Sequence, residues 1–279
     1  MTGKIVRLGG ASGFWGDTPE GARQLVKSGE VDYLVMDYLA EITMSLLARA
    51  KAKSPDAGYP PDFVTQVIQP YAKEISQKKI KIVANAGGVN PLACRDAVAK
   101  ALAEQGVNLK VAAVVGDDVF PLIETLRGEG VKEIQSGAPL PRSVVSANAY
   151  VGAFPIAAAL GMGADIVVTG RAADSALALG PLIHEFGWKP TDFDLLASGS
   201  MAGHVIECGP QATGGIFTDW REVAEGWADI GFPIADCAAD GSFTITKPKG
   251  TGGLVSVRTV AEQVTYETGD PANYVLPAV

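Results

Sequence analysis

The sequence is poor in the side chains that hold metal ions and form disulfides. Its 279 residues include two histidines and three cysteines, Cys94, Cys208 and Cys237, which lie far apart along the chain. Three thiols cannot all pair within one chain, and their spacing matches neither a zinc site nor a redox motif. A zinc site at His204 and Cys208 would need two more ligands, and His184 lies in an apolar helical segment. The sequence therefore predicts reduced thiols and no metal.

Long apolar runs and basic clusters are also missing. Gly, Asp, Lys or Arg interrupts each apolar stretch before it reaches the roughly 20 residues that span a bilayer. The opening Met-Thr-Gly-Lys leads into a strand-length apolar segment, unlike a secretory signal peptide. With 23 basic against 31 acidic residues and a net charge of −8, the composition argues against a nucleic-acid groove. We expect a cytoplasmic protein that binds neither membrane nor nucleic acid.

Over residues 1–190 the sequence alternates between segments with a strand-like pattern and segments with a helix-like pattern. The composition, 47% apolar and 19% charged with 33 glycines, is typical of an α/β protein. Short β-rich apolar segments, typical of buried parallel strands, occur at 5–8, 33–36, 80–84, 111–115 and 166–168. Helix start and stop signals lie between them and predict helices at 18–28, 40–53, 62–77 and 91–105. This pattern predicts a doubly wound, mainly parallel sheet with helices on both faces.

After about Pro190 the pattern changes. Residues 199–215 are rich in glycine and polar residues, 243–245 alternate like a half-exposed strand, and 256–266 have one apolar helical face. We expect residues 191–279 to form a smaller glycine-rich second lobe packed on the first domain. The chain ends in the apolar segment 274–279, which would need cover if it were exposed. That need predicts assembly, either as a homo-oligomer or with a separate C-terminal portion.

The residues that follow the strands are the first candidates for a site, because ligands collect at the carboxyl ends of parallel strands. Gly9, Asp37, Asn85, Gly116 and Gly170 follow the five predicted strands. They are therefore predicted to lie along one edge of the sheet.

Glycine-rich segments follow the first and third strands. Their backbone N–H groups can bind a phosphate, as at the start of a helix, or the glycines can serve tight turns. Neither the dinucleotide fingerprint nor the Walker sequence is present, so NAD and ATP are not expected. The candidate substrate-binding residues here are Gly9, Gly10, Ser12, Gly13, Asp17, Asn85, Gly87 and Gly88.

A second candidate group lies around the last two strands. Arg171 follows a buried strand and can hold a carboxylate or phosphate, or it can pair internally with Asp174. Asp117 and Asp118 can act as a base, as metal ligands or as helix caps. We include Asp117, Arg171 and Ser175 among the substrate-binding candidates and Asp174 among the catalytic ones.

The densest group of reactive side chains lies in residues 203–215, a glycine-rich stretch that we expect to form a loop of the second lobe. His204 is a candidate general acid or base, Cys208 a nucleophile or a small buried side chain, and Glu207 the residue that orients either. Arg171 and His204 are predicted to face one cavity. The candidate substrate-binding residues that follow are Gln211, Thr213, Gly214 and Gly215.

Four motifs in this order resemble the acyclic terpene utilisation protein AtuA family. They are Gly9-Gly10-Ala11-Ser12-Gly13-Phe14-Trp15-Gly16-Asp17, the stretch 168–175, the segment 204–215 and the stretch 250–256. The resemblance covers nearly the whole chain. Members of this family continue into a small additional C-terminal domain, so by the resemblance this chain is shortened or the rest is a separate polypeptide.

The resemblance implies breakdown of branched isoprenoid acids carried as coenzyme A thioesters. Coenzyme A would then be part of the substrate, with no tightly bound cofactor. A lyase or hydratase acting on a branched 3-hydroxyacyl-CoA needs a base and donors to the thioester oxygen. His204, Asp174 and the backbone of Gly214 and Gly215 are candidates for these roles. The alternative is a non-catalytic subunit that binds an acyl-CoA or a partner enzyme.

Overall fold

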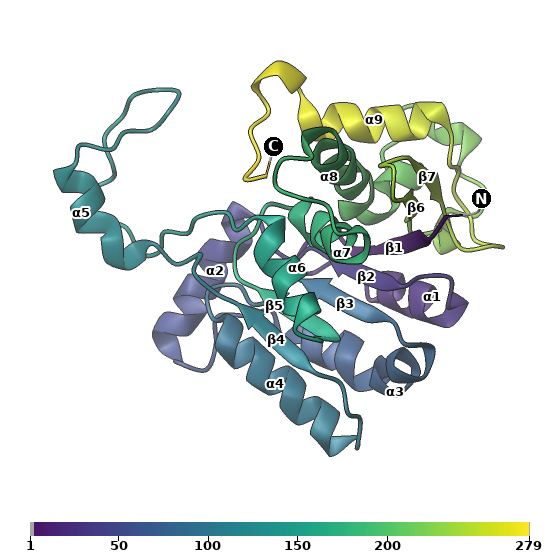
Figure 1. Ribbon diagram of the computed structural model, residues 1–279, viewed down its shortest axis with the longest axis horizontal. Helices are drawn as coiled ribbons and strands as arrows, with labels where there is room; N and C mark the ends of the chain where they lie inside the picture. The colour runs from purple at the N-terminus through teal and green to yellow at the C-terminus, as the bar shows by residue number, and fades with distance from the viewer. Residues whose placement is uncertain (1–2, 279) are drawn as a thin grey trace.

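The computed structural model describes residues 3–278 and contains a seven-stranded sheet in the order β4-β5-β3-β2-β1-β6-β7 (Figure 1). Strands β1 to β5 are parallel, and β6 and β7 extend the sheet antiparallel beyond β1. The strands are β1 (Ile5–Ser12), β2 (Tyr33–Met36), β3 (Lys81–Ala84), β4 (Val111–Val114), β5 (Ile166–Thr169), β6 (Ile234–Ala238) and β7 (Phe243–Thr246). The five predicted strands and their shared direction are confirmed.

Helices cover both faces of this sheet, as predicted. The helices are α1 (Glu20–Ser28), α2 (Glu41–Lys53), α3 (Gln69–Lys78), α4 (Pro91–Glu104), α5 (Ile123–Gly128), α6 (Ala153–Gly161), α7 (Ala176–Phe186), α8 (Phe193–Glu207) and α9 (Val257–Thr268). A π-helical segment, η1 (Phe63–Ile68), leads into α3. Short 3-10 turns are η2 (Phe120–Leu122), η3 (Gly209–Thr213), η4 (Trp220–Glu222), η5 (Trp227–Asp229) and η6 (Pro271–Asn273).

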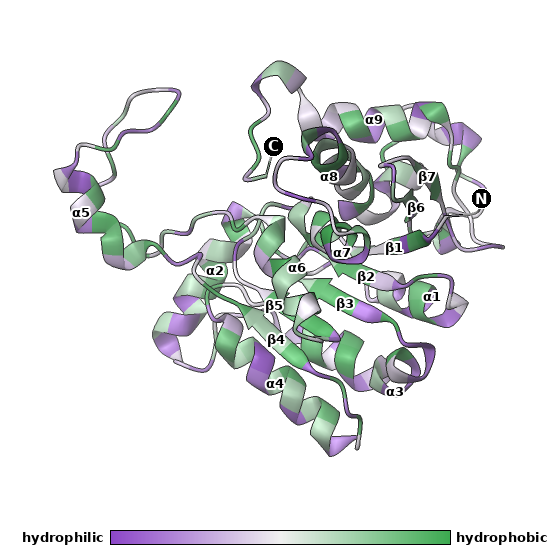
Figure 2. Ribbon diagram, viewed as in Figure 1, coloured by the Kyte–Doolittle hydropathy of each residue, from purple (hydrophilic) through white to green (hydrophobic). Residues whose placement is uncertain are grey.

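The two faces of the sheet carry separate apolar cores because side chains alternate along each strand. Leu34 and Ile82 pack with α1 to α4, whereas Val35 and Val83 pack with α6, α7 and α8. Figure 2 shows the strands as the most continuously hydrophobic part of the ribbon. The chain moves from β1 through β3 to β4 on the first face and returns to β5 on the second. That change of face is what right-handed crossovers require when the direction of travel along the sheet reverses.

The second lobe expected over residues 191–279 is not confirmed in the part of the chain that the structure describes. Strands β6 and β7 belong to the same sheet as β1, and α8 lies on the same face as α7 (Figure 1). The glycine-rich stretch from residue 199 was expected to be a loop, but it is helical through Glu207. Its glycines serve close packing: a Cβ on Gly203 would lie 2.8 Å from the carbonyl oxygen of Ser175. A polar, glycine-rich stretch can therefore be a buried helix when another helix needs close approach.

Strand β1 is longer than predicted, so Gly9 and Gly10 lie inside it and not in a loop after it. Gly10 donates its N–H to the carbonyl of Pro233, and a Cβ on Gly10 would lie 1.9 Å from the carbonyl oxygen of Ile206. Glycine at this position lets the end of α8 approach the sheet. The geometry therefore favours a structural role for Gly9 and Gly10 over phosphate binding.

An arm of residues 118–150 extends away from the body between β4 and β5 (Figure 1). Its base is held by an antiparallel bridge between Asp118 and Asn148, and it carries η2 and the short helix α5. Apolar side chains on it are exposed, including Ile134 at 95%. The sequence pattern did not predict this extension.

The C-terminal segment packs against the body. Leu276 and Ala278 contact the core under α7 and α8, and the hydroxyl of Tyr274 lies 2.9 Å from Nε2 of His204. Val279 lies outside the described residues. This packing covers part of the apolar tail from which assembly was predicted, although Val275 stays 89% exposed, and assembly itself stays a prediction. Among the described residues, helices of the length and hydropathy needed to cross a membrane are absent.

Candidate functional site

The carboxyl ends of β1, β2 and β3 are joined through Asp37. Asp37 follows β2 and is 3% exposed. Its Oδ1 accepts hydrogen bonds from Nδ2 of Asn85 at 2.7 Å and from the backbone of Leu39 at 2.8 Å. Ser12, at the end of β1, donates its hydroxyl to the carbonyl of Asp37. Asn85 therefore orients a buried carboxylate, and Ser12 ties the neighbouring strand to it.

Two more carboxyl groups meet Asp37 at this edge. One oxygen from each of Asp37, Asp174 and Glu207 lies within 4.8 Å of the other two. Asp174 comes from the loop between β5 and α7, and Glu207 is the last residue of α8. Glu207 is 5% exposed, and Oδ1 of Asp174 is buried without a hydrogen-bond partner. We call these three residues the carboxylate cluster.

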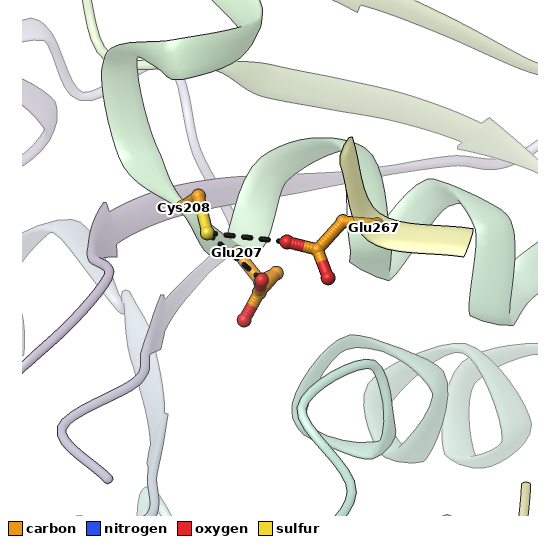
Figure 3. A group of neighbouring side chains, drawn as sticks. All are labelled: Glu207, Cys208 and Glu267. Atoms are coloured by element: carbon orange, nitrogen blue, oxygen red, sulfur yellow. Dashed lines mark hydrogen bonds between the residues drawn. The ribbon is translucent and has the colours of Figure 1, made fainter. Parts of the chain in front are cut away.

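Glu207 also belongs to a second group, formed with Cys208 and Glu267 (Figure 3). The thiol of Cys208 donates to Oε1 of Glu207 at 2.9 Å and lies 3.3 Å from Oε1 of Glu267. Burial and the neighbouring carboxylate of Glu207 raise the pKa of the Cys208 thiol. A thiol that stays protonated is a poor nucleophile, so this environment favours Cys208 as a hydrogen-bond donor to Glu207.

Burial holds protons on the carboxylate cluster. Desolvation raises the pKa of Asp37 and raises that of Glu207 well above its ordinary value. The pKa of Asp174 rises to about 8, because its carboxyl is desolvated and lies beside Asp37. Like charges this close cannot all ionise. At neutral pH the cluster therefore holds at least one protonated carboxyl group, which can serve as a general acid.

Arg171 is engaged within the chain. Its guanidinium donates to the carbonyl of Leu39 at 2.6 Å and to the hydroxyl of Tyr150 at 2.8 Å, and it stacks on the Tyr150 ring. It lies 3.7 Å from Oδ1 of Asp174 and 3.6 Å from Glu41. The internal Arg171–Asp174 pair, which the sequence left as an alternative, is thus present. Binding of a substrate anion by Arg171 stays a prediction.

His204 lies on α8 and not in a loop, as had been expected. It is 2% exposed, and burial lowers the pKa of its imidazole. Its ring borders a cavity of about 280 Å³ together with Tyr274, but Arg171 is not among the residues that line this cavity. The prediction that Arg171 and His204 face one cavity is therefore not confirmed.

The glycine amides expected to hold a phosphate or a thioester oxygen donate hydrogen bonds within the chain. The N–H of Gly13 donates to Asp17, that of Gly87 to Thr169, and that of Gly88 to Asn85. The N–H groups of Gly214 and Gly215 donate to the carbonyls of Gln211 and Pro210 in the η3 turn. Because these donors are used, the geometry favours turn formation over an oxyanion or phosphate cradle in this conformation.

The remaining candidates also hold the fold together. Asp117 accepts from the backbone N–H of Arg171 and from Nδ2 of Asn148, which ties the ends of β4 and β5 to the arm. Asp118 caps η2 through the N–H of Phe120. Ser175 is buried at the start of α7, and Thr213 donates to the carbonyl of Gly231. Gln211 keeps a buried Oε1 that lacks a hydrogen-bond partner.

Both groups of acidic and thiol side chains are close enough to share a metal ion. The absence of a metal stays a prediction.

Two members of the site were given no catalytic or substrate-binding role in the prediction from sequence. Asp37 carried a usable signal, because it directly follows a buried strand and so had to lie at the carboxyl edge. Glu267 had none: it lies near the end of an amphipathic helix, and only the packing of α9 beside α8 brings it to Glu207.

Comparison with known proteins bears on the whole chain. The sequence model of the acyclic terpene utilisation family protein AtuA matches residues 6–279. Neither a curated protein nor a solved structure matches the chain. Since the family match spans all of the elements described above, the chain belongs to the AtuA family of acyclic terpene utilisation proteins.

Proposed function

We propose that this protein is an enzyme of branched, isoprenoid-type acyl-CoA catabolism, a lyase or hydratase that acts on a coenzyme A thioester. The family match supports a place in isoprenoid catabolism. The observation that carries the proposal is the carboxylate cluster, in which Asp37, Asp174 and Glu207 meet at the carboxyl edge of the sheet. Coenzyme A enters as part of the substrate.

Both reactions need one acid and one base beside a 3-hydroxyacyl thioester. In a hydratase, an ionised carboxylate takes the proton from the carbon next to the thioester carbonyl, and a protonated carboxyl gives its proton to the departing hydroxyl. Water and a carbon–carbon double bond result. In a lyase, the base takes the hydroxyl proton instead, the neighbouring carbon–carbon bond breaks, and the acid protonates the enolate that leaves.

The surroundings of the three carboxyl groups suit separate acid and base roles. Asp174, with a pKa of about 8, is mostly protonated at neutral pH and is the candidate acid. Asp37 receives two hydrogen bonds on Oδ1, which favour its ionised form over that of its neighbours and make it the candidate base. Glu207, buried beside both, is the candidate second acid, with Cys208 donating to it. His204 is the candidate for orienting the substrate from the neighbouring turn of α8.

The test is a thermal-shift panel of free coenzyme A, short acyl-CoAs and branched acyl-CoAs, followed by mass spectrometry of the incubated thioesters. We expect stabilisation by branched thioesters and a change in mass of a branched 3-hydroxyacyl-CoA. Binding without turnover would contradict the enzyme proposal and favour the non-catalytic subunit. Neither binding nor turnover would contradict both.

A further inference from the structure

A cavity next to the carboxylate cluster is not used in the chemistry above. It has a volume of about 280 Å³ and lies between α8 and the chain that follows α9. Apolar atoms of Ala197, Met201, Pro271 and Leu276 make up much of its wall. Its polar part is the His204–Tyr274 pair, whose rings meet edge to face at 5.2 Å.

The cavity and the carboxylate cluster share two elements. His204 borders the cavity and Glu207 belongs to the cluster, and the two residues are one helical turn apart on α8. Thr268 borders the cavity and directly follows Glu267, which lies against Glu207 and Cys208. These shared elements place the lining of the cavity within one helical turn of Glu207 and one residue of Glu267.

We propose that this cavity binds the apolar acyl chain of the thioester, which rests on the function proposed above. Its lining is mainly apolar, and its volume lies just below the range of about 300–1,000 Å³ that is usual for ligand pockets. That size suits a short branched hydrocarbon chain, whereas a whole coenzyme A would exceed it. Tyr274 and Leu276 make the C-terminal segment one wall of the acyl subsite.

Calorimetric titration of acetyl-CoA and of a methyl-branched acyl-CoA into the whole chain tests the proposal. Each buried methylene is expected to tighten binding by about fourfold, so the branched thioester should bind at least about tenfold more tightly. Ala197→Phe fills the mouth of the cavity from an exposed position on α8. It should remove that preference and leave the affinity for acetyl-CoA unchanged. Ala261→Phe, an exposed change on α9 outside the cavity, is the matched control.

The outcomes separate this proposal from the proposed function. Equal affinity of the unmodified chain for both thioesters would overturn the acyl subsite even if turnover were seen. The acyl subsite would also be overturned if Ala197→Phe weakened the binding of acetyl-CoA and of the branched acyl-CoA equally, or weakened neither. A chain-length preference abolished by Ala197→Phe, without turnover, would support the subsite and contradict the enzyme proposal.

A second, independent feature is the free edge of the sheet at β4. Among the described residues β4 pairs only with β5, and its Val-Ala-Ala-Val sequence contains no charge or proline to block further pairing. A groove of about 460 Å³ runs beside it, lined by residues 111–115 and by Pro155, Ala158 and Met162. Val115 and Met162 are 55% and 86% exposed.

The charges that flank β4 are complementary to each other. Lys110 precedes the strand and Asp118 follows it, and both are exposed. If two copies of the strand run antiparallel, Lys110 of each copy approaches the end of the strand that carries Asp118 of the other. The arm, which carries further exposed apolar side chains, begins beyond this end of β4 and extends away from the body (Figure 1).

The geometry points to a second copy of this chain as the occupant of the β4 edge, in an antiparallel two-fold pairing. A self-complementary edge with apolar side chains between opposite charges meets the requirement of an isologous interface. It would extend the seven-stranded sheet across both copies and cover the groove between β4 and α6.

Light scattering coupled to gel filtration measures the mass of the particle in solution. We expect a dimer, a monomer for Val115→Glu, and a dimer for Val257→Glu, which makes the same change at an 89% exposed position on α9. If Val115→Glu fails to fold, as judged by circular dichroism, Met162→Glu, directly after α6, replaces it. A monomeric unmodified chain at micromolar concentration would overturn the proposal, whether or not another partner occupies the edge. A dimer that persists in the folded variant would overturn it equally.

Discussion

The carboxyl group of Asp174 makes the stability of the fold depend on pH. Its pKa is about 8 in the folded protein, against an ordinary value of 3.8. Between these two pH values the folded state binds more protons than the unfolded chain, so the free energy of unfolding falls as pH rises. The contribution of protonated Asp174 to the free energy of unfolding is complete below about pH 4 and is lost as pH rises through about 8.

Asp174→Asn removes the titrating group and should flatten this dependence. Relative to the unmodified protein, the variant should gain at least about 3 °C in melting temperature between pH 5 and pH 8, or roughly 1 kcal/mol for a chain of this size. Thermal melts followed by circular dichroism at both pH values measure the difference. Asp56→Asn, at an exposed position, is the control and should show no such gain. Parallel curves for Asp174→Asn and the unmodified protein would show that Asp174 is not held protonated.

Position 10 requires glycine because any side chain there would clash with the backbone of α8. A Cβ there would lie 1.9 Å from the carbonyl oxygen of Ile206, and that atom belongs to the backbone of α8. We expect Gly10→Ala to lower the free energy of unfolding by at least about 2 kcal/mol, through displacement of α8 from β1. Chemical denaturation gives the value. Gly128→Ala, where nothing lies within 4 Å of the added atom, should be neutral or slightly stabilising.

At the scale of elements, the sequence predicted the parallel strands well because each is a short apolar run between helix signals. It failed at α8, where Gly199 and Gly203 resemble a loop until α7 is present to pack against them. It also failed at β6, whose partner β1 lies more than 200 residues away. A local sequence pattern can predict a single helix or strand. Close contacts between helices and the pairing of distant strands depend on residues far away in the sequence, which a local pattern does not include.

One side chain in α1 holds the chain that leads into the antiparallel extension of the sheet. Gln24 is 8% exposed, accepts from the N–H of Phe232 at 2.7 Å and donates to the carbonyl of Ile230 at 3.2 Å, just before β6. Gln24→Leu would leave both backbone groups without partners. We expect a loss of about 1–3 kcal/mol in the free energy of unfolding, measured by denaturation.

Gln66→Leu is the control for that experiment. The Gln66 side chain bonds to Asp62 at an exposed position, so its removal should change stability by less than about 0.5 kcal/mol. Equal effects of the two substitutions would mean that Gln24 does not hold the start of β6.

At the scale of the whole molecule, the carboxylate cluster forms because distant segments meet at one edge of the sheet. Asp37 directly follows β2, Asp174 lies in the loop between β5 and α7, and Glu207 ends α8. The sequence placed Asp174 and Glu207 among the catalytic candidates from their local motifs. Their contact, and the raised pKa values that follow from it, depend on burial and mutual distance, which no local pattern encodes.

The most direct test of the account is exchange of the proton on the carbon next to the thioester carbonyl. The chain is incubated with a branched 3-hydroxyacyl-CoA in D₂O, and deuterium uptake is followed by mass spectrometry. We predict uptake with the unmodified protein, a loss of about 100-fold or more with Asp37→Asn, which removes the candidate base, and no loss with Asp56→Asn at an exposed position. Uptake at the same rate with Asp37→Asn, or none with the unmodified protein, would contradict a role for the carboxylate cluster in proton transfer at this carbon.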